Sequence, residues 1–177
     1  MFTSGCETSR RVPSRLRARF SPVSREPGWV LGCAVVSDAL PGYFDQFGWR
    51  YERRHPGEFL TGFSGDLGSW DVVVRVSDLV VTFTIAGYVD LPSGASPGPA
   101  LLHALLRANH DLNLAKLGLD RDHDVCLSVE MPADGFGYAQ FADALMAIGH
   151  YADELKGRLE AAVLADTEES AAGRRVL

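Results

Sequence analysis

Two neighbouring segments, residues 70–77 and 79–88, alternate strictly between large apolar and smaller or polar side chains. A period of two with many β-branched residues is typical of antiparallel strands that bury one face. We therefore predict a β-hairpin whose larger side chains face helices. The other face is small, rich in threonine and only partly charged, which makes it the first candidate interaction surface. Its candidate binding residues are Val73, Arg75, Val80, Thr82 and Thr84.

Three other segments repeat their apolar residues at helical spacing, which predicts helices at residues 38–47, 97–115 and 138–165. In the second helix, Leu102 and Leu106 are expected to widen the apolar stripe that faces the core. The third helix would be roughly 40 Å long at 1.5 Å per residue. A small sheet is not expected to cover that length, so its last turns either pack on a second subunit or remain solvated.

Shorter alternating stretches complete the predicted sheet. Strands are expected from residue 49 to 52 and from 58 to 64, and two more at residues 117–120 and 125–131. The resulting order is α-β-β-β-β-α-β-β-α. Neither the strands nor the helices could bury their apolar sides alone. The pattern therefore predicts one α+β domain with helices packed on one face of an antiparallel sheet.

Charge is distributed unevenly along the 177 residues, whose net charge is -6. Residues 1–28 contain six arginines and two glutamates, a net +4, which leaves -10 for residues 29–177. We predict an Arg-rich disordered tail over 1–28, one domain over 29–165 and a second disordered tail over 166–177. A start assigned too early, or a transit peptide, would also explain the first segment. Nucleic-acid binding is not expected, except through this Arg-rich tail.

The cysteines and the hydropathy of the chain favour the cytoplasm. Cys6, Cys33 and Cys126 are odd in number and form no CxxC motif, which fits a reducing compartment without a disulfide framework. No apolar run approaches the ~20 residues that a membrane-spanning helix requires. We therefore expect no membrane association.

An acidic turn is the first candidate for a metal site. Asp120, Asp122 and Asp124 have the spacing of a calcium loop. An EF-hand requires Gly at the sixth loop position and Glu at the twelfth, where this chain has Val125 and Met131. We therefore interpret the segment as a polar hairpin turn, and we predict no metal site and no cofactor.

Two histidines and one cysteine define the alternative of an enzyme. His123 and Cys126 are close in sequence and suggest a Cys/His nucleophile pair, to which His110 could be added. The alternative function is thus a small-molecule-binding or hydrolytic enzyme with a pocket near these three residues. A partly buried structural cysteine is the simpler interpretation, and no nucleophile or phosphate-loop motif is present. The prediction is a protein that is not an enzyme.

Asn109 and Asn113 lie one helical turn apart, where the second helix gives way to a strand. Their side-chain amides can satisfy carbonyl groups freed at the helix end, or main-chain groups of the neighbouring strand. We predict this structural role for both residues, with contact to a ligand as the alternative.

The segments at residues 105–113 and 116–120, LLRANHDLN and KLGLD, resemble the YbjN family, which is also described as bacterial sensory transduction regulators. The Met131-Pro132 step and the sequence Phe47-Gly48-Trp49 are similar to further positions of that family. The resemblance covers roughly residues 38–164. It implies a fold similar to type III secretion chaperones, commonly dimeric and without known catalysis.

The function predicted from these patterns is protein binding. The chain is expected to be a chaperone-like or regulatory adaptor that acts as a homodimer on a protein client not identified by the sequence. The client would meet the threonine-rich sheet face, by strand addition at a sheet edge if the client is extended.

Overall fold

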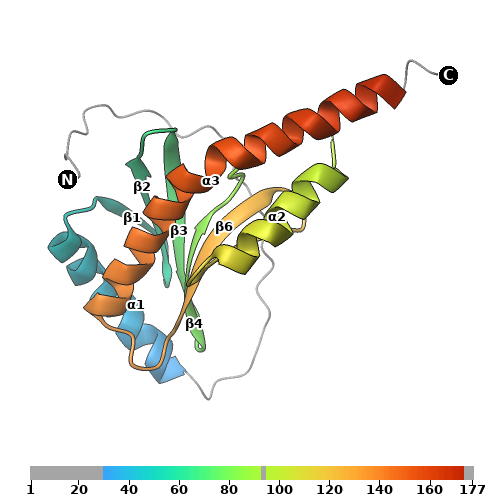
Figure 1. Cartoon of the computed structure of the whole chain (residues 1–177). Helices are drawn as coiled ribbons and strands as arrows, with labels where there is room; N and C mark the ends of the chain where they lie inside the picture. The colour runs from blue at the N-terminus through green and yellow to red at the C-terminus, as the bar shows by residue number, and fades with distance from the viewer. Residues whose placement is uncertain (1–29, 93–94, 174–177) are drawn as a thin grey trace.

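The computed structural model describes residues 30–92 and 95–173 and confirms the predicted α+β class and element order (Figure 1). Six strands form one sheet in the order β1-β2-β3-β4-β6-β5, and every neighbouring pair is antiparallel. The elements are α1 (Val30–Phe47), β1 (Tyr51–His55), β2 (Glu58–Ser64), β3 (Ser69–Val76), β4 (Val80–Ile85), α2 (Pro99–Asp111), β5 (Ala115–Leu119), β6 (Val125–Pro132) and α3 (Tyr138–Gly173).

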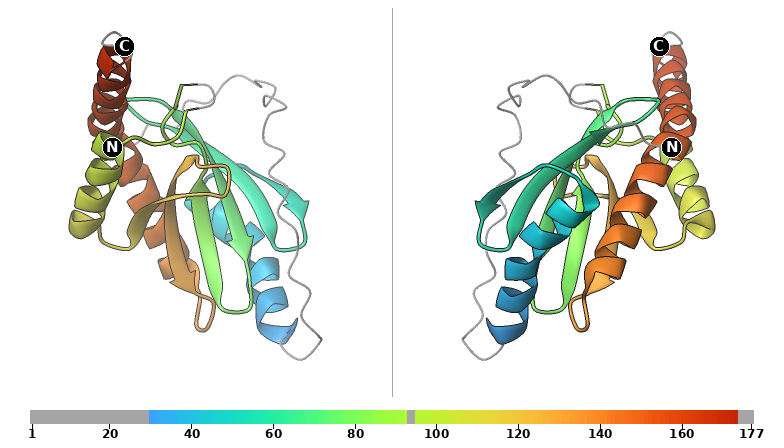
Figure 2. Two further views of the ribbon diagram at one scale, coloured as in Figure 1. Left: turned by 90° about the vertical axis from the view of Figure 1, so that its right-hand side faces the viewer. Right: turned by 90° about the vertical axis from the view of Figure 1, so that its left-hand side faces the viewer.

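Within the described residues, the helices cover one face of the sheet and no helix lies on the other. The two views of Figure 2 show α1 and the first half of α3 behind the strands from one side and in front of them from the other. The alternation in β3 and β4 follows the prediction, because Val72, Val74 and Phe83 are fully buried on the helix side. Val73 and Thr84 are partners in the β3–β4 register and are half-buried on the opposite face.

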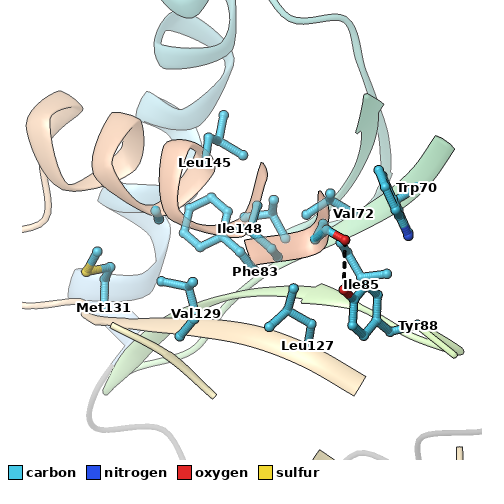
Figure 3. Close-up of a cluster of buried hydrophobic side chains, with 14 of the residues drawn as sticks. Trp70, Val72, Phe83, Ile85, Tyr88, Leu127, Val129, Met131, Leu145 and Ile148 are labelled. Atoms are coloured by element: carbon cyan, nitrogen blue, oxygen red, sulfur yellow. Dashed lines mark hydrogen bonds between the residues drawn. The ribbon is translucent and has the colours of Figure 1, made fainter. Parts of the chain in front are cut away.

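The core lies between the sheet and α3. Phe141, Leu145 and Ile148 of α3 are fully buried with Phe83 and Val129 from the central strands (Figure 3). Burial of one such side chain stabilises the fold by about 1.5–3 kcal/mol. These residues come from distant parts of the chain, so the helix and the sheet form a single packed unit.

The first helix begins earlier than predicted. The predicted start at residue 38 is wrong, because α1 begins at Val30. Val36, Leu40 and Phe44 are buried along one stripe, so core packing extends the helix across the expected start. Pro41 therefore lies in the helix interior, where it cannot donate a hydrogen bond to the carbonyl of Ser37.

The last helix continues further than predicted. α3 has 36 residues, so it is roughly 54 Å long, and its end extends past the sheet beside α2 (Figure 1). The prediction of disorder from Asp166 is wrong for residues 166–173, while residues 1–28 and 174–177 lie outside the described residues. The Asp166 carboxylate accepts hydrogen bonds from the main-chain N–H groups of Ala100 and Leu101, at 2.9 and 3.0 Å. This contact fixes the end of α3 to the start of α2.

No helix within residues 30–92 and 95–173 combines the length and the apolar character that a membrane span requires.

Candidate protein-binding surfaces

The face of the sheet opposite the helices brings the five predicted binding residues together. Val73, Arg75, Val80, Thr82 and Thr84 all point away from the helices and are all half-buried. The strand registers place Leu60, Val73, Thr84 and Ser128 in one row across four strands. Leu60 and Ser128, at the two ends of this row, are buried. This row of the open face is therefore uncharged, with methyl and hydroxyl groups side by side.

Two cross-strand ion pairs lie on either side of Thr82 on this open face. Arg75 Nε lies 2.9 Å from Glu58 Oε2, and Lys116 Nζ lies 2.7 Å from Glu130 Oε1. The register pairs Thr82 with Arg75 on one side and with Glu130 on the other. Because the pairs are partly exposed, each stabilises the fold by at most about 1 kcal/mol. Their main effect is to leave the open face nearly neutral.

Asn109 closes one edge of the sheet. Its Nδ2 donates to the carbonyl oxygen of Leu117 at 2.9 Å, and the Leu117 N–H donates to its Oδ1 at 2.7 Å. One side-chain amide thus bonds to both outward main-chain groups of Leu117, at the centre of β5, as a neighbouring strand would. Asn113 behaves differently, because its main-chain N–H, at 3.2 Å from Tyr151 Oη, makes the contact to α3.

The outer side of α2 carries an apolar surface that the sequence reasoning assigned to the core. The expectation that Leu102 and Leu106 face the core is wrong, because the buried residues of α2 are Leu101, Leu105 and Ala108. The exposed leucines of α2 and β5 and the segment between them are Leu102 at 40%, Leu106 at 73%, Leu114 at 60% and Leu119 at 39%. Leu102 and Leu106 lie one helical turn apart, so the outer side of α2 is a candidate interaction surface.

The residues of the enzyme alternative come from different sides of the sheet. His110 is exposed on α2, on the helix side, whereas the half-buried Cys126 belongs to the open face. His123 is exposed in the turn between β5 and β6. Burial, and then the charge of Asp120, raises the pKa of the Cys126 thiol, which disfavours the reactive thiolate. The position of Cys126 on the open face and its protonated thiol therefore both fit a structural cysteine.

In the acidic turn, the Asp120 carboxylate is hydrogen-bonded to the main chain of the turn itself. Asp120 Oδ1 accepts the main-chain N–H groups of Asp122 and Asp124, both at 2.9 Å. Desolvation, followed by the charges of Asp120 and Asp122, raises the pKa of Asp124. Within the described part of the chain, no group of three or more His, Cys, Asp or Glu side chains is arranged to hold a metal ion.

Two solved structures of proteins from type III secretion systems are similar to part of this chain. A chain in the crystal structure of the Yersinia pestis type III secretion chaperone SycH, in complex with a stable fragment of YscM2, is 19% identical, with a TM-score of 0.46 over 68% of this chain and 98% of that chain. A chain of the heterodimeric ExoU–SpcU complex from the Pseudomonas aeruginosa type III secretion system is 18% identical, with a TM-score of 0.46 over 68% of this chain and 94% of that chain.

No curated protein matches the chain in sequence. The profile of the family YbjN, described as "Putative bacterial sensory transduction regulator", matches residues 37–161. This range contains all six strands, both shorter helices except the first turns of α1, and most of α3. The match agrees with the resemblance seen in the segments around Asn109 and Gly118, and the chain belongs to the YbjN family.

Proposed function

We propose that the protein is a non-enzymatic binding module, chaperone-like or regulatory, that captures a protein client on its open sheet face. The observation that carries the proposal is the composition of that face. Four half-buried residues present methyl and hydroxyl groups, the half-buried Arg75 belongs to one of the two compensated ion pairs beside them, and no described helix covers these five residues. The residues are Val73, Arg75, Val80, Thr82 and Thr84.

This chemistry suits a polypeptide client. Protein interfaces are depleted of net charge at their centre and combine apolar contacts with hydrogen bonds. The threonine hydroxyls can donate and accept, so they can meet the polar groups of a client, while Val73 and Val80 provide apolar area. The charged side chains beside Thr82 are paired across strands, Arg75 with Glu58 and Glu130 with Lys116, so they leave no net charge there.

We further propose that the protein works as a homodimer in the bacterial cytoplasm. The exposed leucines on the outer side of α2 support the dimer. In a dimer with two-fold symmetry the same surface of both subunits forms the interface, so the leucines of one subunit would be covered by those of the other. The open sheet face lies on the other side of the sheet from α2, so client and second subunit would not compete for one surface.

A site-specific crosslinking experiment tests the client-binding face. A photoreactive amino acid replaces Thr84 in the full-length protein, expressed in its own host, and a matched protein carries it at the exposed Met146 of α3. We expect one recurrent protein to be crosslinked from position 84 and not from position 146. Equal crosslinking from both positions, or none from position 84, would contradict the assignment of the open face.

Point variants test the same face by affinity. Thr82→Glu places a charge at the neutral centre, and Met146→Glu adds the same charge on the opposite side of the domain. Capture of the crosslinked protein should fall at least tenfold for Thr82→Glu and stay unchanged for Met146→Glu. Circular dichroism and thermal melting of both variants separate loss of binding from loss of folding. A folded Thr82→Glu variant that captures normally would refute the proposal.

A further inference from the structure

The two edges of the sheet differ in how their outward main-chain groups are satisfied. On β5, Asn109 occupies both outward groups of Leu117. On β1, antiparallel pairing with β2 directs alternate main-chain groups, those of Tyr51 and Arg53 among them, away from the sheet. No residue in the described ranges bonds to these two pairs of groups. The β1 edge can therefore accept another strand, whereas the β5 edge is blocked at its centre.

The β1 edge is basic within an acidic protein. Residues 50–55 read RYERRH, so three arginines and a histidine stand against one glutamate, while residues 29–177 together carry -10. Arg53 is held in place from the helix side, where its Nη2 lies 3.3 Å from Ser37 Oγ and 3.7 Å from Asp38 Oδ1. Arg54 lines an open surface hollow together with Arg53, His55 and Pro56.

The same features prevent the edge from pairing with itself. Arginines on an edge strand are typical protection against association with a second copy of the same edge. Two β1 edges from separate copies would bring like charges together, which costs binding energy. A strand with carboxylate side chains would meet attraction at the same positions. The charges therefore disfavour a second copy of β1 at this edge and favour a strand with carboxylate side chains.

We propose that β1 accepts an extended acidic segment of a protein partner as an additional strand beside Tyr51–His55. The inference rests on the proposed protein-binding function and specifies the chemistry of the bound segment. An added strand places alternate side chains on the two faces of the sheet. Its carboxylates would meet Arg53 and Arg54, which line one hollow beside β1, and its main chain would bond to the outward groups of β1.

A protein segment fits this edge better than a nucleic acid. An added peptide satisfies the outward N–H and C=O groups of Tyr51 and Arg53 by the hydrogen bonds of a regular sheet. A nucleic-acid backbone has no such repeating pattern, and the -10 charge of residues 29–177 repels its phosphates beyond the basic edge.

Binding of synthetic probes to the full-length protein tests the proposal. The first probe is a fluorescein-labelled twelve-residue peptide of alternating Glu and Thr or Val; the second replaces every Glu with Lys, and the third is a single-stranded oligonucleotide. By fluorescence anisotropy, the acidic peptide should bind at least tenfold more tightly than either of the other probes. Tighter binding of the lysine peptide or of the oligonucleotide would overturn the proposal.

A matched pair of variants locates the site. Arg54→Glu reverses a charge on β1, and Arg158→Glu makes the same change on the exposed side of α3. Arg54→Glu should weaken binding of the acidic peptide at least fivefold, and Arg158→Glu less than twofold. Equal effects of the two variants, or no effect of Arg54→Glu, would exclude β1 as the site.

Changes to the peptide main chain distinguish strand addition from simple charge attraction, because only strand addition needs the main-chain N–H groups. A peptide of the same sequence with N-methyl groups on alternate residues keeps its carboxylates but loses every second N–H donor. Such a peptide, methylated in the binding register, should bind at least tenfold more weakly. Unchanged binding for methylation in both registers would refute strand addition. Client crosslinking through Thr84 is independent of these probes, so it would persist if only the β1 proposal failed.

Discussion

At the scale of single residues, Asn109 links a helix to the edge of the sheet. Asn109→Leu removes both hydrogen bonds to Leu117 and leaves two main-chain groups without a partner. We expect the free energy of unfolding to fall by about 1–3 kcal/mol, measured by chemical denaturation, and the Leu117 amide to exchange faster with deuterium. Asn113→Ala, whose side chain is not used in the contact to Tyr151, should change stability by less than about 0.5 kcal/mol. Equal losses in the two variants would contradict the role of the Asn109 amide.

Tyr88 makes the stability of the fold sensitive to alkaline pH. Its side chain is fully buried, and its Oη donates to the carbonyl oxygens of Ala152 at 2.7 Å and Tyr151 at 3.3 Å. Desolvation, and then the charges of Asp153 and Glu160, raise the pKa of this phenol. The neutral phenol is thus favoured in the folded state. Its contribution to stability is complete below the unfolded pKa of about 10 and is lost as the pH rises above it.

The Tyr88→Phe variant tests this dependence. At pH 7 it should lose about 0.5–1.5 kcal/mol, because the hydrogen bond to α3 is missing. Melting temperatures between pH 7 and pH 11 should fall more steeply above pH 10 for the wild type than for the variant. Parallel curves for the two proteins would show that Tyr88 does not carry the alkaline transition.

At the scale of elements, the sequence pattern predicted the features that depend only on neighbouring residues. The faces of β3 and β4 followed from alternation alone, and Val73 and Thr82 lie where it placed them. The missed features depend on distant contacts. Leu101 and Leu102 are equally apolar, so only the position of α3 decides which of them is buried. The open β1 edge could be found only once the strand order was known.

The contact between α3 and α2 is a long-range helix cap. Gly98, at the N-cap of α2, has no side chain to bond the first N–H groups, and Asp166 supplies the acceptor from α3. Asp166→Ala should therefore lower the free energy of unfolding by about 1 kcal/mol, the usual cost of a lost N-cap. Asp166→Asn should lose less, because one oxygen acceptor remains. Thermal melting measures both.

The exposed Glu168, two residues after Asp166 on α3, provides the control. Glu168→Ala removes one carboxylate without touching α2 and should change stability by less than about 0.5 kcal/mol. A loss as large as that of Asp166→Ala would indicate an effect of charge on α3 itself. The cap also explains why the helix continues past residue 165, since α2 holds its later turns.

At the scale of the whole molecule, three surfaces with different chemistry lie on separate parts of one small domain. The open sheet face is neutral, the β1 edge is basic, and the outer side of α2 is apolar. The strand order places β1 and β5 at opposite edges, so the basic edge and the side next to α2 are far apart in the sheet. A client could therefore lie across the face and along β1 without covering the leucines.

Measurements of self-association test whether the outer side of α2 is the surface that binds a second subunit. If α2 pairs with its own copy, Leu106→Glu places a charge at an apolar contact on both subunits at once. We expect light scattering to give the mass of a dimer for the wild type and of a monomer for Leu106→Glu at the same micromolar concentration. Leu106 is already exposed in the single chain, so the variant should keep its secondary structure.

Met146 of α3 is also exposed, and Met146→Glu adds the same charge at a distance from α2. This variant should remain a dimer if the outer side of α2 is the interface. A monomeric wild type would refute the homodimer, and a dimeric Leu106→Glu variant would move the interface away from α2. Because the open face lies across the sheet from α2, the monomeric Leu106→Glu variant should still be crosslinked to the client through position 84. Loss of that crosslink would show that the client needs both subunits.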